Sequence, residues 1–349
     1  DEGLELTGLT QDQVDVLTDR DHSVEGILGV AVSLESQHPV DAAIVGLGLC
    51  WARGESCYIP LSHNYLGAPT QLAEGAVLEI LGPLLASDEL ELTVEDAKLV
   101  GALLGRGGVT LGAGLRGALL SSYVLDPQRE SHELTRLVMD QSGHSLLERK
   151  NEIGQQRADE APVEIVARVA AERAQALLDV GDYLEGAIAE DEELAPLLRD
   201  MELPLARILA EMEARGCLVD VDPLRELSHE LAKELADLEA EVRAEAGWPI
   251  NINSPKQLQK LLFEQLGLST GRKTKTGFST DADVLADLAV EHPIAAKIDE
   301  YRGISKLKSG YLDALPSLVN RKTGRVHTFY NQAVAATGRL SSSEPNMQN

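Results

Sequence analysis

A change of hydrophobic period near residue 163 is the feature that most constrains the fold. Before it, short apolar or alternating runs are separated by polar and turn residues. They predict a three-stranded meander over Ile27–Leu34, Ala42–Cys50 and Ser56–Leu61. After residue 163 the pattern is almost purely helical and rich in Ala, Glu and Leu. The chain is therefore expected to join an α/β layer to a mainly helical region.

The α/β layer continues beyond the meander. We expect a helix from about Gln71 to Leu85, a short strand over Glu89–Leu92, and then alternating helices and connections. Residues 1–26 are polar and have no sustained period, so they are interpreted as a linker.

The helical region carries clear start and stop signals. A helix over Leu203–Arg215 is followed by Gly216 as a cap, and Asp222–Pro223 starts a long helix that ends near Gly247. In this helix apolar residues recur at spacings of 3, 4, 4, 3 and 4, namely Leu224, Leu227, Leu231, Leu235, Leu238 and Val242. Such a stripe needs one partner surface.

Charge is distributed unevenly along the 349 residues. The net charge of −26 argues against a polyanionic partner, although a generally acidic proteome would also explain its sign. Residues 251–349, however, hold 13 Lys and Arg against 9 Asp and Glu, whereas residues 1–250 hold 18 against 48. If DNA is bound, we expect the C-terminal third to bind it.

Cysteine usage and hydropathy bear on the compartment. Cys50, Cys57 and Cys217 show no C-x-x-C spacing, so neither a zinc site nor a disulfide framework is indicated. No apolar run approaches the roughly 18 residues that a membrane span needs, and the first residues lack the pattern of a signal peptide. We expect a cytoplasmic protein without a membrane partner.

Three basic or amide-rich segments follow the long helix. Asn253 or Ser254 is expected to cap a helix that starts at Pro255, which makes its N-terminus a candidate phosphate site. The connector over residues 270–277 is basic and bracketed by Gly. Further on, Arg302, Lys306 and Ser309 share one face at spacings i, i+4 and i+7. The alternatives are a mobile loop for the connector and a solvated helix face.

The last 13 residues form a run of small hydrogen-bonding side chains around one arginine. Arg339 offers a planar fork of five donors, and hydroxyl and amide groups surround it: Thr337, Ser341, Ser342, Asn346, Gln348 and Asn349. These groups suit sugar, phosphate and groove edges better than a core. A polar surface loop is the alternative for any one of them.

The C-terminal half resembles the polymerase region of the DNA polymerase I family (family A). The resemblance covers residues 201–349 and is carried by Asn253–Ser254–Pro255–Lys256–Gln257–Leu258, Tyr301–Arg302–Gly303, Thr323–Gly324–Arg325–Val326–His327 and Gln332 to Ser342. It implies a helical thumb that grips primer–template duplex DNA, with Arg339 reaching into the minor groove. It also implies DNA contacts by Asn253, Ser254, Lys256, Lys273, Lys275, Arg302, Lys306, Lys308, Thr337, Ser341, Asn346, Gln348 and Asn349.

The resemblance also bears on catalysis. The family's two metal-binding aspartates and its nucleotide-positioning helix would lie beyond residue 349, so we expect no catalytic residue, metal or cofactor in this chain. Mg²⁺ is expected for the complete polymerase, and deoxynucleoside triphosphates are expected as partners only with the missing palm and fingers. The 349 residues alone are expected not to polymerise.

The N-terminal half resembles, more weakly, the family's 3′-5′ exonuclease domain, which has a ribonuclease-H-like α/β fold. The active form needs several carboxylates around two metal ions. Only Glu35 of the first motif is retained beside Ser33, the second motif shows Asp96 and Val100, and the third shows Val169 and Arg173. Because Val cannot ligate Mg²⁺ and Arg repels it, we expect a vestigial domain without proofreading.

Together these features predict five segments: a linker (residues 1–26), a degenerate exonuclease-like domain (27–198), the palm base (199–222), the thumb (223–319) and a truncated first palm segment (320–349). The expected function is DNA-directed DNA polymerase, in replication and repair, by a monomeric, nucleoid-associated protein of bacterial type. The start resembles the linker that follows an upstream 5′-nuclease domain. The alternatives are a non-catalytic DNA-binding module derived from such a polymerase, and a residual nuclease that uses Glu35 and Asp96.

Overall fold

The computed structural model describes residues 27–35, 40–269, 273–274 and 277–348. The chain divides into two compact units. We call them the sheet unit (residues 1–216 and 328–349) and the helical unit (residues 217–327). Mixed helix and sheet structure confirms the coarse expectation of an α/β layer joined to a helical region. The finer division into five segments stays a prediction.

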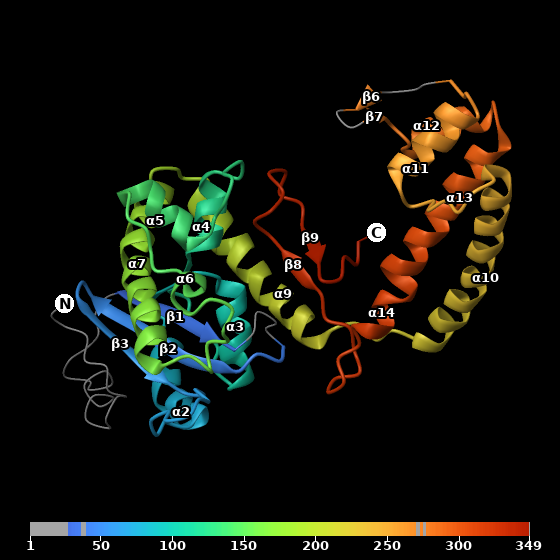
Figure 1. Cartoon of the computed structure of the whole chain (residues 1–349). Coiled ribbons are helices and arrows are strands. Elements are labelled where there is room, and N and C mark those ends of the chain that lie inside the picture. Colours follow the sequence, from blue (N-terminus) through green and yellow to red (C-terminus); the bar gives the residue numbers. More distant parts are fainter. Residues whose placement is uncertain (1–26, 36–39, 270–272, 275–276, 349) are drawn as a thin grey trace. The chain divides into compact units, whose positions relative to one another are not determined.

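The sheet unit is organised around a five-stranded sheet in the order β3-β2-β1-β4-β5 (Figure 1). The first three strands form the predicted antiparallel meander, and the other two run parallel to β1. Their bounds are β1 Ile27–Leu34, β2 Ile44–Ala52, β3 Glu55–Pro60, β4 Glu91–Val94 and β5 Leu115–Gly117. The ends of β2, β3 and β4 differ from the sequence prediction by one or two residues, and the short strand β5 was not predicted.

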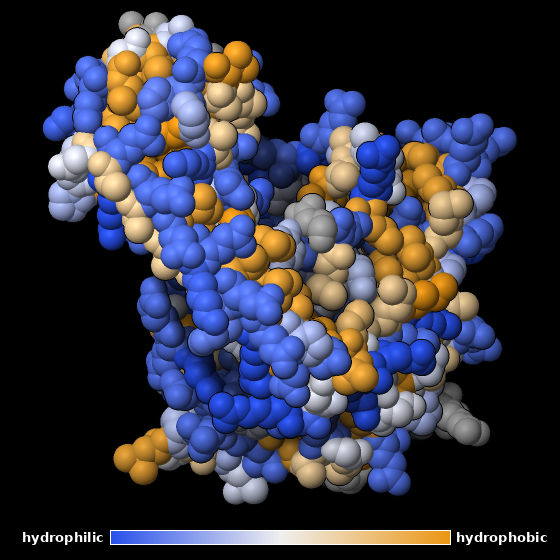
Figure 2. Space-filling view, turned by 90° about the vertical axis from the view of Figure 1, so that its right-hand side faces the viewer, coloured by the Kyte–Doolittle hydropathy of each residue, from blue (hydrophilic) through white to orange (hydrophobic). Residues whose placement is uncertain are grey.

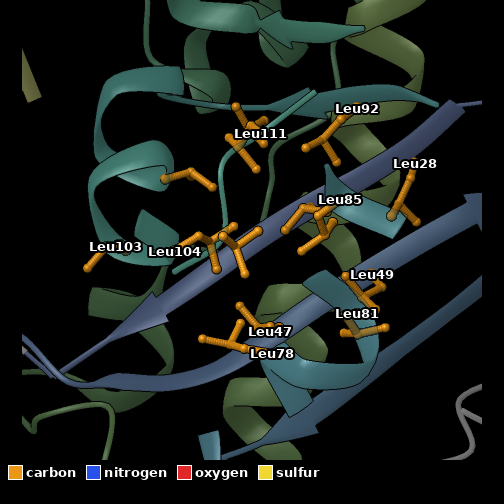
Figure 3. Close-up of a cluster of buried hydrophobic side chains, with 14 of the residues drawn as sticks. Leu28, Leu47, Leu49, Leu78, Leu81, Leu85, Leu92, Leu103, Leu104 and Leu111 are labelled. Atoms are coloured by element: carbon orange, nitrogen blue, oxygen red, sulfur yellow. The ribbon is translucent and has the colours of Figure 1, made fainter. Parts of the chain in front are cut away.

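Leucines fill one face of this sheet (Figure 3). Those of β1, β2 and β4 meet those of α2 (Glu74–Leu85) and α3 (Ala97–Arg106). Many of them are fully buried, including Leu47, Leu49, Leu81, Leu92 and Leu104. Burial of such side chains contributes about 1.5–3 kcal/mol each, so this cluster is a main source of stability in the unit.

The long helix α7 (Val163–Ala189) covers the other face and lies unusually close to it. A Cβ atom on Gly29 would lie 2.2 Å from the Ala174 carbonyl oxygen, and one on Gly48 would lie 2.6 Å from that of Ala170. Small residues on both sides therefore permit the close approach of main chain to main chain. The remaining helical segments of the unit are α4 Ala118–Leu125, α5 Leu134–Ser142, α6 Arg149–Ile153, α8 Leu194–Pro196, the π-helical η1 Leu197–Glu202, and α9 Leu203–Arg215.

The helical unit is built on α10 (Val221–Ala246), which begins beside Asp222–Pro223 and ends at Gly247 in the left-handed region, as predicted. Its other elements are α11 Pro255–Gln259, the π-helical η2 Lys260–Gln265, β6 Lys273–Thr274, β7 Gly277–Phe278, α12 Ala282–Ala289, α13 Pro293–Leu307, the π-helical η3 Lys308–Leu312 and α14 Ala314–Ser317. The base of the unit is closed by Cys217 and Val326, whose main chains exchange hydrogen bonds of 2.8 and 2.9 Å.

The apolar stripe of α10 finds its partner in α13, η3 and α14. Only its C-terminal part is buried: Val242 and Ala246 join the core of the unit, whereas Leu227 is 40% exposed. The first half of the stripe is thus thinly covered, which the regular spacing did not indicate. Ile294, Ala295 and Ile298 of α13 complete this core.

The surface is mixed in character. On the face in Figure 2, hydrophilic residues cover large areas and hydrophobic residues lie in patches between them. Among the described residues, every helix is too short or too polar to cross a membrane.

Candidate nucleic-acid interface

The arginine-bearing C-terminal segment folds as a hairpin within the sheet unit. Its strands are β8 (Phe329–Asn331) and β9 (Ser341–Ser343), with Tyr330 opposite Ser342. The connecting loop, residues 332–340, turns at Gly338, whose φ of 77° favours glycine. Thr337 and Arg339 lie exposed on this loop, beside the start of β9.

Arg339 keeps its donors available. In the part of the chain that the structure describes, its guanidinium has no ion pair or hydrogen bond, and Thr337 and Ser341 likewise keep their side chains unbonded. A planar fork of five donors at the tip of a hairpin can bind phosphate oxygens or the acceptors of a groove. The geometry thus leaves the predicted central residue accessible.

Other predicted contact residues shape the turn after β9. The hydroxyl of Ser342 is buried, donates to Asn346 Oδ1 at 3.1 Å and accepts from the Met347 N–H at 2.9 Å. Asn346 Oδ1 also accepts the N–H of Gln348, at 2.9 Å, and Gln348 Nε2 donates to the Leu340 carbonyl at 3.2 Å. Asn346 and Gln348 are exposed but already engaged in these bonds. Asn349 lies outside the described residues.

In the helical unit, the first candidate group surrounds the start of α11. Ser254 is the N-cap, Pro255 is the first helical residue, and the Ser254 hydroxyl makes no capping bond. The Asn253 N–H donates to Asn251 Oδ1 at 2.9 Å. Burial raises the pKa of Tyr301, and the neighbouring Asn253 side chain lowers it in part. Lys256 is exposed in the first turn.

The second group lies on α13 and differs from the predicted stripe. The Arg302 guanidinium donates to the Thr280 carbonyl, and burial lowers its pKa. It therefore ties α13 to the segment before α12 rather than standing in solvent. Lys308 pairs with Asp313 at 2.7 Å. Lys306 is exposed and has no ion pair among the described residues.

Ser309 does not continue the face of Arg302 and Lys306 in the expected way. The helix changes to π-helical hydrogen bonding at Lys308, so the α-helical spacing no longer applies. The Ser309 hydroxyl donates to the Ser305 carbonyl at 2.7 Å. Of the basic connector, Lys273 lies in β6 opposite Phe278. Lys275 lies outside the described residues.

The positions predicted to be remnants of an exonuclease site lie around one edge of the sheet unit, and the carboxylates among them are already bonded. Glu35, after β1, forms an ion pair with Arg157, which also pairs with Asp159 at 2.9 Å. Arg173 of α7 pairs with Glu95. Sequence reasoning missed Glu95 and Arg157, because no local pattern indicates a partner 78 or 122 residues away.

The remaining positions serve the fold. Asp96 caps α3 by accepting from the N–H groups of Lys98 and Leu99, at 2.9 and 3.1 Å. Burial raises the pKa of Asp96, and these donors lower it in part. Ser33 hydrogen-bonds Tyr58, and Val100 and Val169 are buried: both belong to the core.

Among the residues that the structure describes, no three His, Cys, Asp or Glu side chains come together in a way that could hold a metal ion.

Comparisons with known proteins place these features in a family. Residues 221–349 match the family model described as DNA polymerase family A. DNA polymerase I of Synechocystis sp. is 38% identical over 322 residues, which are 90% of this chain and 32% of that protein. DNA polymerase I of Pseudomonas aeruginosa is 39% identical over 318 residues, 88% of this chain and 35% of that protein.

A solved structure extends the similarity to almost the whole chain. The POL domain of Pol1 from M. smegmatis, in complex with DNA primer-template and dNTP, matches with a TM-score of 0.82 and 33% identity over 98% of this chain and 55% of that one. Residues 221–349 of this chain thus match DNA polymerase family A, and most of the chain is similar to DNA polymerase I proteins. Its two curated relatives named above are DNA polymerase I proteins, and the chain spans about a third of their length.

Proposed function

We propose that this chain acts in DNA-directed DNA synthesis of the DNA polymerase I type, in replication and repair. The observation that carries the proposal is the similarity to a polymerase domain over 98% of the chain, including the hairpin that bears Arg339. Its partner is then primer–template double-stranded DNA.

The proposed DNA contacts form two groups with different availability. On the hairpin, Arg339, Thr337 and Ser341 have unbonded donors. In the helical unit, Lys256 and Lys306 are exposed cations suited to phosphates. The proposed set is completed by Asn253, Ser254, Lys273, Lys275, Lys308, Asn346, Gln348 and Asn349. Arg302 is proposed to have a mainly structural role, because it is bonded to the Thr280 carbonyl. These groups bind backbone and minor groove without reading sequence, as a replicative or repair enzyme requires.

The five-stranded layer is proposed to be a ribonuclease-H-like exonuclease domain that has lost 3′-5′ exonuclease activity. The strand order, with one antiparallel meander and two parallel strands, supports the fold. The ion pairs of Glu35 and Glu95 support the loss, because a carboxylate held by an arginine is poorly placed to share a metal ion.

The remaining parts of the proposal concern the complete polymerase. Carboxylates that the family carries outside the matched residues are proposed to bind Mg²⁺. A helix that also lies outside the matched residues is proposed to position the deoxynucleoside triphosphate. The 349-residue chain is proposed to bind duplex DNA without extending it. We further propose a monomer in the bacterial cytoplasm, associated with the nucleoid.

The test is primer–template binding as a function of salt concentration. We expect affinity to fall steeply with salt, and Lys306→Ala to reduce the slope by about 1, since one phosphate contact is lost. Lys233→Ala is the matched control, an exposed lysine on α10. Arg339→Ala is expected to weaken binding about tenfold, whereas Arg53→Ala, on the β2–β3 turn, leaves it unchanged.

Absence of binding at low salt would overturn the proposal for this chain. Equal effects of the test and control lysines would instead show that only general charge attracts DNA.

The proposed loss of nuclease activity has its own test. Single-stranded DNA is incubated with the chain in Mg²⁺ and in Mn²⁺, and no degradation is expected. Degradation that disappears in Glu35→Ala would contradict the vestigial assignment.

A further inference from the structure

A buried ion pair in the sheet unit has no role in the function proposed above. Lys98, near the start of α3, and Glu213, near the end of α9, place Nζ and Oε1 2.5 Å apart, with side chains only 12% and 5% exposed. Removing two charges from water costs free energy that their attraction does not always return. Stability by itself is therefore a weak reason for the pair, and its further partners are informative.

These partners include the two main-chain polar groups of Tyr330 in β8. The Tyr330 N–H donates to Glu213 Oε1 at 2.7 Å, and the Tyr330 carbonyl accepts from Lys98 Nζ at 2.8 Å. In a wider sheet a neighbouring strand would satisfy such groups. The β8–β9 sheet has two strands, and the ion pair supplies the acceptor and the donor that a third strand would offer.

Two further side chains, which make three hydrogen bonds, hold the chain between β8 and Arg339. Gln332 is buried, and its Nε2 donates to the carbonyl and to Oε2 of Glu202 at 3.0 and 2.8 Å. The Tyr123 hydroxyl, from α4, donates to the Ala335 carbonyl at 2.8 Å. Residues 336–339 are exposed and contribute nothing to a core. The position of the loop therefore depends on these polar contacts more than on apolar packing.

We propose that the Lys98–Glu213 pair, assisted by Tyr123, positions the hairpin so that Arg339 meets duplex DNA. This inference rests on the proposed function. Lys98 and Tyr123 come from the layer with the degenerate nuclease positions, so that layer serves the DNA grip as a support. Lys98, Glu213 and Tyr123 are positioning residues, because they contact the hairpin and act through Arg339.

A double-mutant cycle tests the proposal. Arg339→Ala is made in the native chain and in a Lys98→Met/Glu213→Gln background, which removes both charges of the pair together. Dissociation constants for primer–template DNA are measured. Arg339→Ala is expected to weaken binding about tenfold in the native chain and less than about threefold in the altered background, because a displaced arginine has less contact to lose.

The control background removes a different ion pair of the sheet unit. Arg116 of β5 pairs with Glu91 of the neighbouring strand β4. The contacts given for these two residues involve neither β8 nor β9. In Arg116→Met/Glu91→Gln the effect of Arg339→Ala is expected to stay about tenfold. Amide exchange over residues 332–340 should rise in the Lys98→Met/Glu213→Gln chain and not in the control.

The outcomes separate the two proposals. An equal tenfold effect of Arg339→Ala in all backgrounds overturns the positioning role while DNA binding stands. A native chain that fails to bind overturns the proposed function and this inference with it. An Arg339→Ala variant that binds like the native chain overturns the DNA contact of Arg339 and this inference, while DNA binding stands. If the double variant does not fold, Tyr123→Phe takes its place, since it removes one hydroxyl from the same support. It should likewise reduce the effect of Arg339→Ala.

Discussion

Arginines have opposite roles in two regions of the sheet unit. Beside the sheet, Arg157 and Arg173 each form an ion pair with a glutamate, and the charges cancel locally. On the hairpin loop, Arg339 has no such partner within the described residues and keeps its donors exposed. The comparison teaches that the same side chain either neutralises a surface or offers a binding group, according to its neighbours.

Lys98 represents a third condition, a buried cation whose carboxylate partner and main-chain partner come from distant parts of the sequence. The three conditions predict graded effects when the cation is removed. The effects on the free energy of unfolding should fall from the buried pair, through the half-buried pair, to the exposed side chain.

The largest effect is expected for Lys98→Ala. It removes the cation of a buried ion pair, which typically costs about 3–5 kcal/mol of unfolding free energy. Urea unfolding would measure this cost. Lys98→Met/Glu213→Gln should cost clearly less, and equal costs for the two would show that lost packing, not the uncompensated charge, dominates.

A smaller effect is expected for Arg173→Ala, at about 1 kcal/mol. Glu95 would lose its ion pair but keep the N–H of Leu134 as a donor, at 3.2 Å, and some contact with water. Arg168→Ala, on the same helix and more exposed, is the matched control and should cost less than about 0.5 kcal/mol. A larger loss of unfolding free energy in Arg168→Ala than in Arg173→Ala would contradict the comparison.

A pH-dependent effect is expected from His63, a buried residue shortly after the end of β3. Its ring lies 2.9 Å from the Tyr58 hydroxyl and 3.1 Å from the Ala161 carbonyl, and burial lowers the pKa of His63 below its ordinary value of 6.5. As pH falls below 6.5 the unfolded state binds a proton that the folded state does not. The contribution of His63 to stability is therefore fully present above pH 6.5 and is lost progressively as the pH falls below 6.5.

The measurement is unfolding free energy between pH 7 and pH 5. His63→Gln should make the decline shallower, although His132, whose pKa burial also lowers, still contributes. His229→Gln, at an exposed position on α10, should leave the decline unchanged. A decline of unchanged slope in His63→Gln would show that other groups account for it.

The smallest effect on stability is expected for Arg339→Ala, within about 0.5 kcal/mol, because the side chain is exposed and without a partner in the described structure. In contrast, Arg339→Ala should change the free energy of DNA binding by more than it changes the free energy of unfolding. Thermal unfolding beside DNA binding checks both. A strongly destabilised Arg339→Ala chain would mean that this arginine has a structural role.

Local patterns were sufficient for many elements. The span of β1, the end of α9 at Gly216 and the end of α10 at Gly247 agree with the sequence prediction. Alternation, helix caps and glycine conformations act within a few residues, so they are visible along the chain. The exposed position of Arg339 also followed from the polar sequence around it.

Long-range partners could not be predicted in this way. The sequence presented Arg302 as one of three groups on a basic face, but the fold directs it to the carbonyl of Thr280. It presented Asp96 as a remnant of a metal site, and the fold uses it as a helix cap.

The sequence by itself determined the first four strands, the longer helices after them, several helix ends, the separation of charge and the resemblance to a polymerase family. Only the tertiary structure decided which charges are cancelled and which remain available. Lys98 and Tyr330 are 232 residues apart, and Glu35 and Arg157 are 122 apart. Such pairs form because packing of the sheet and helices brings distant segments together, and no local propensity records the partner that each side chain will meet.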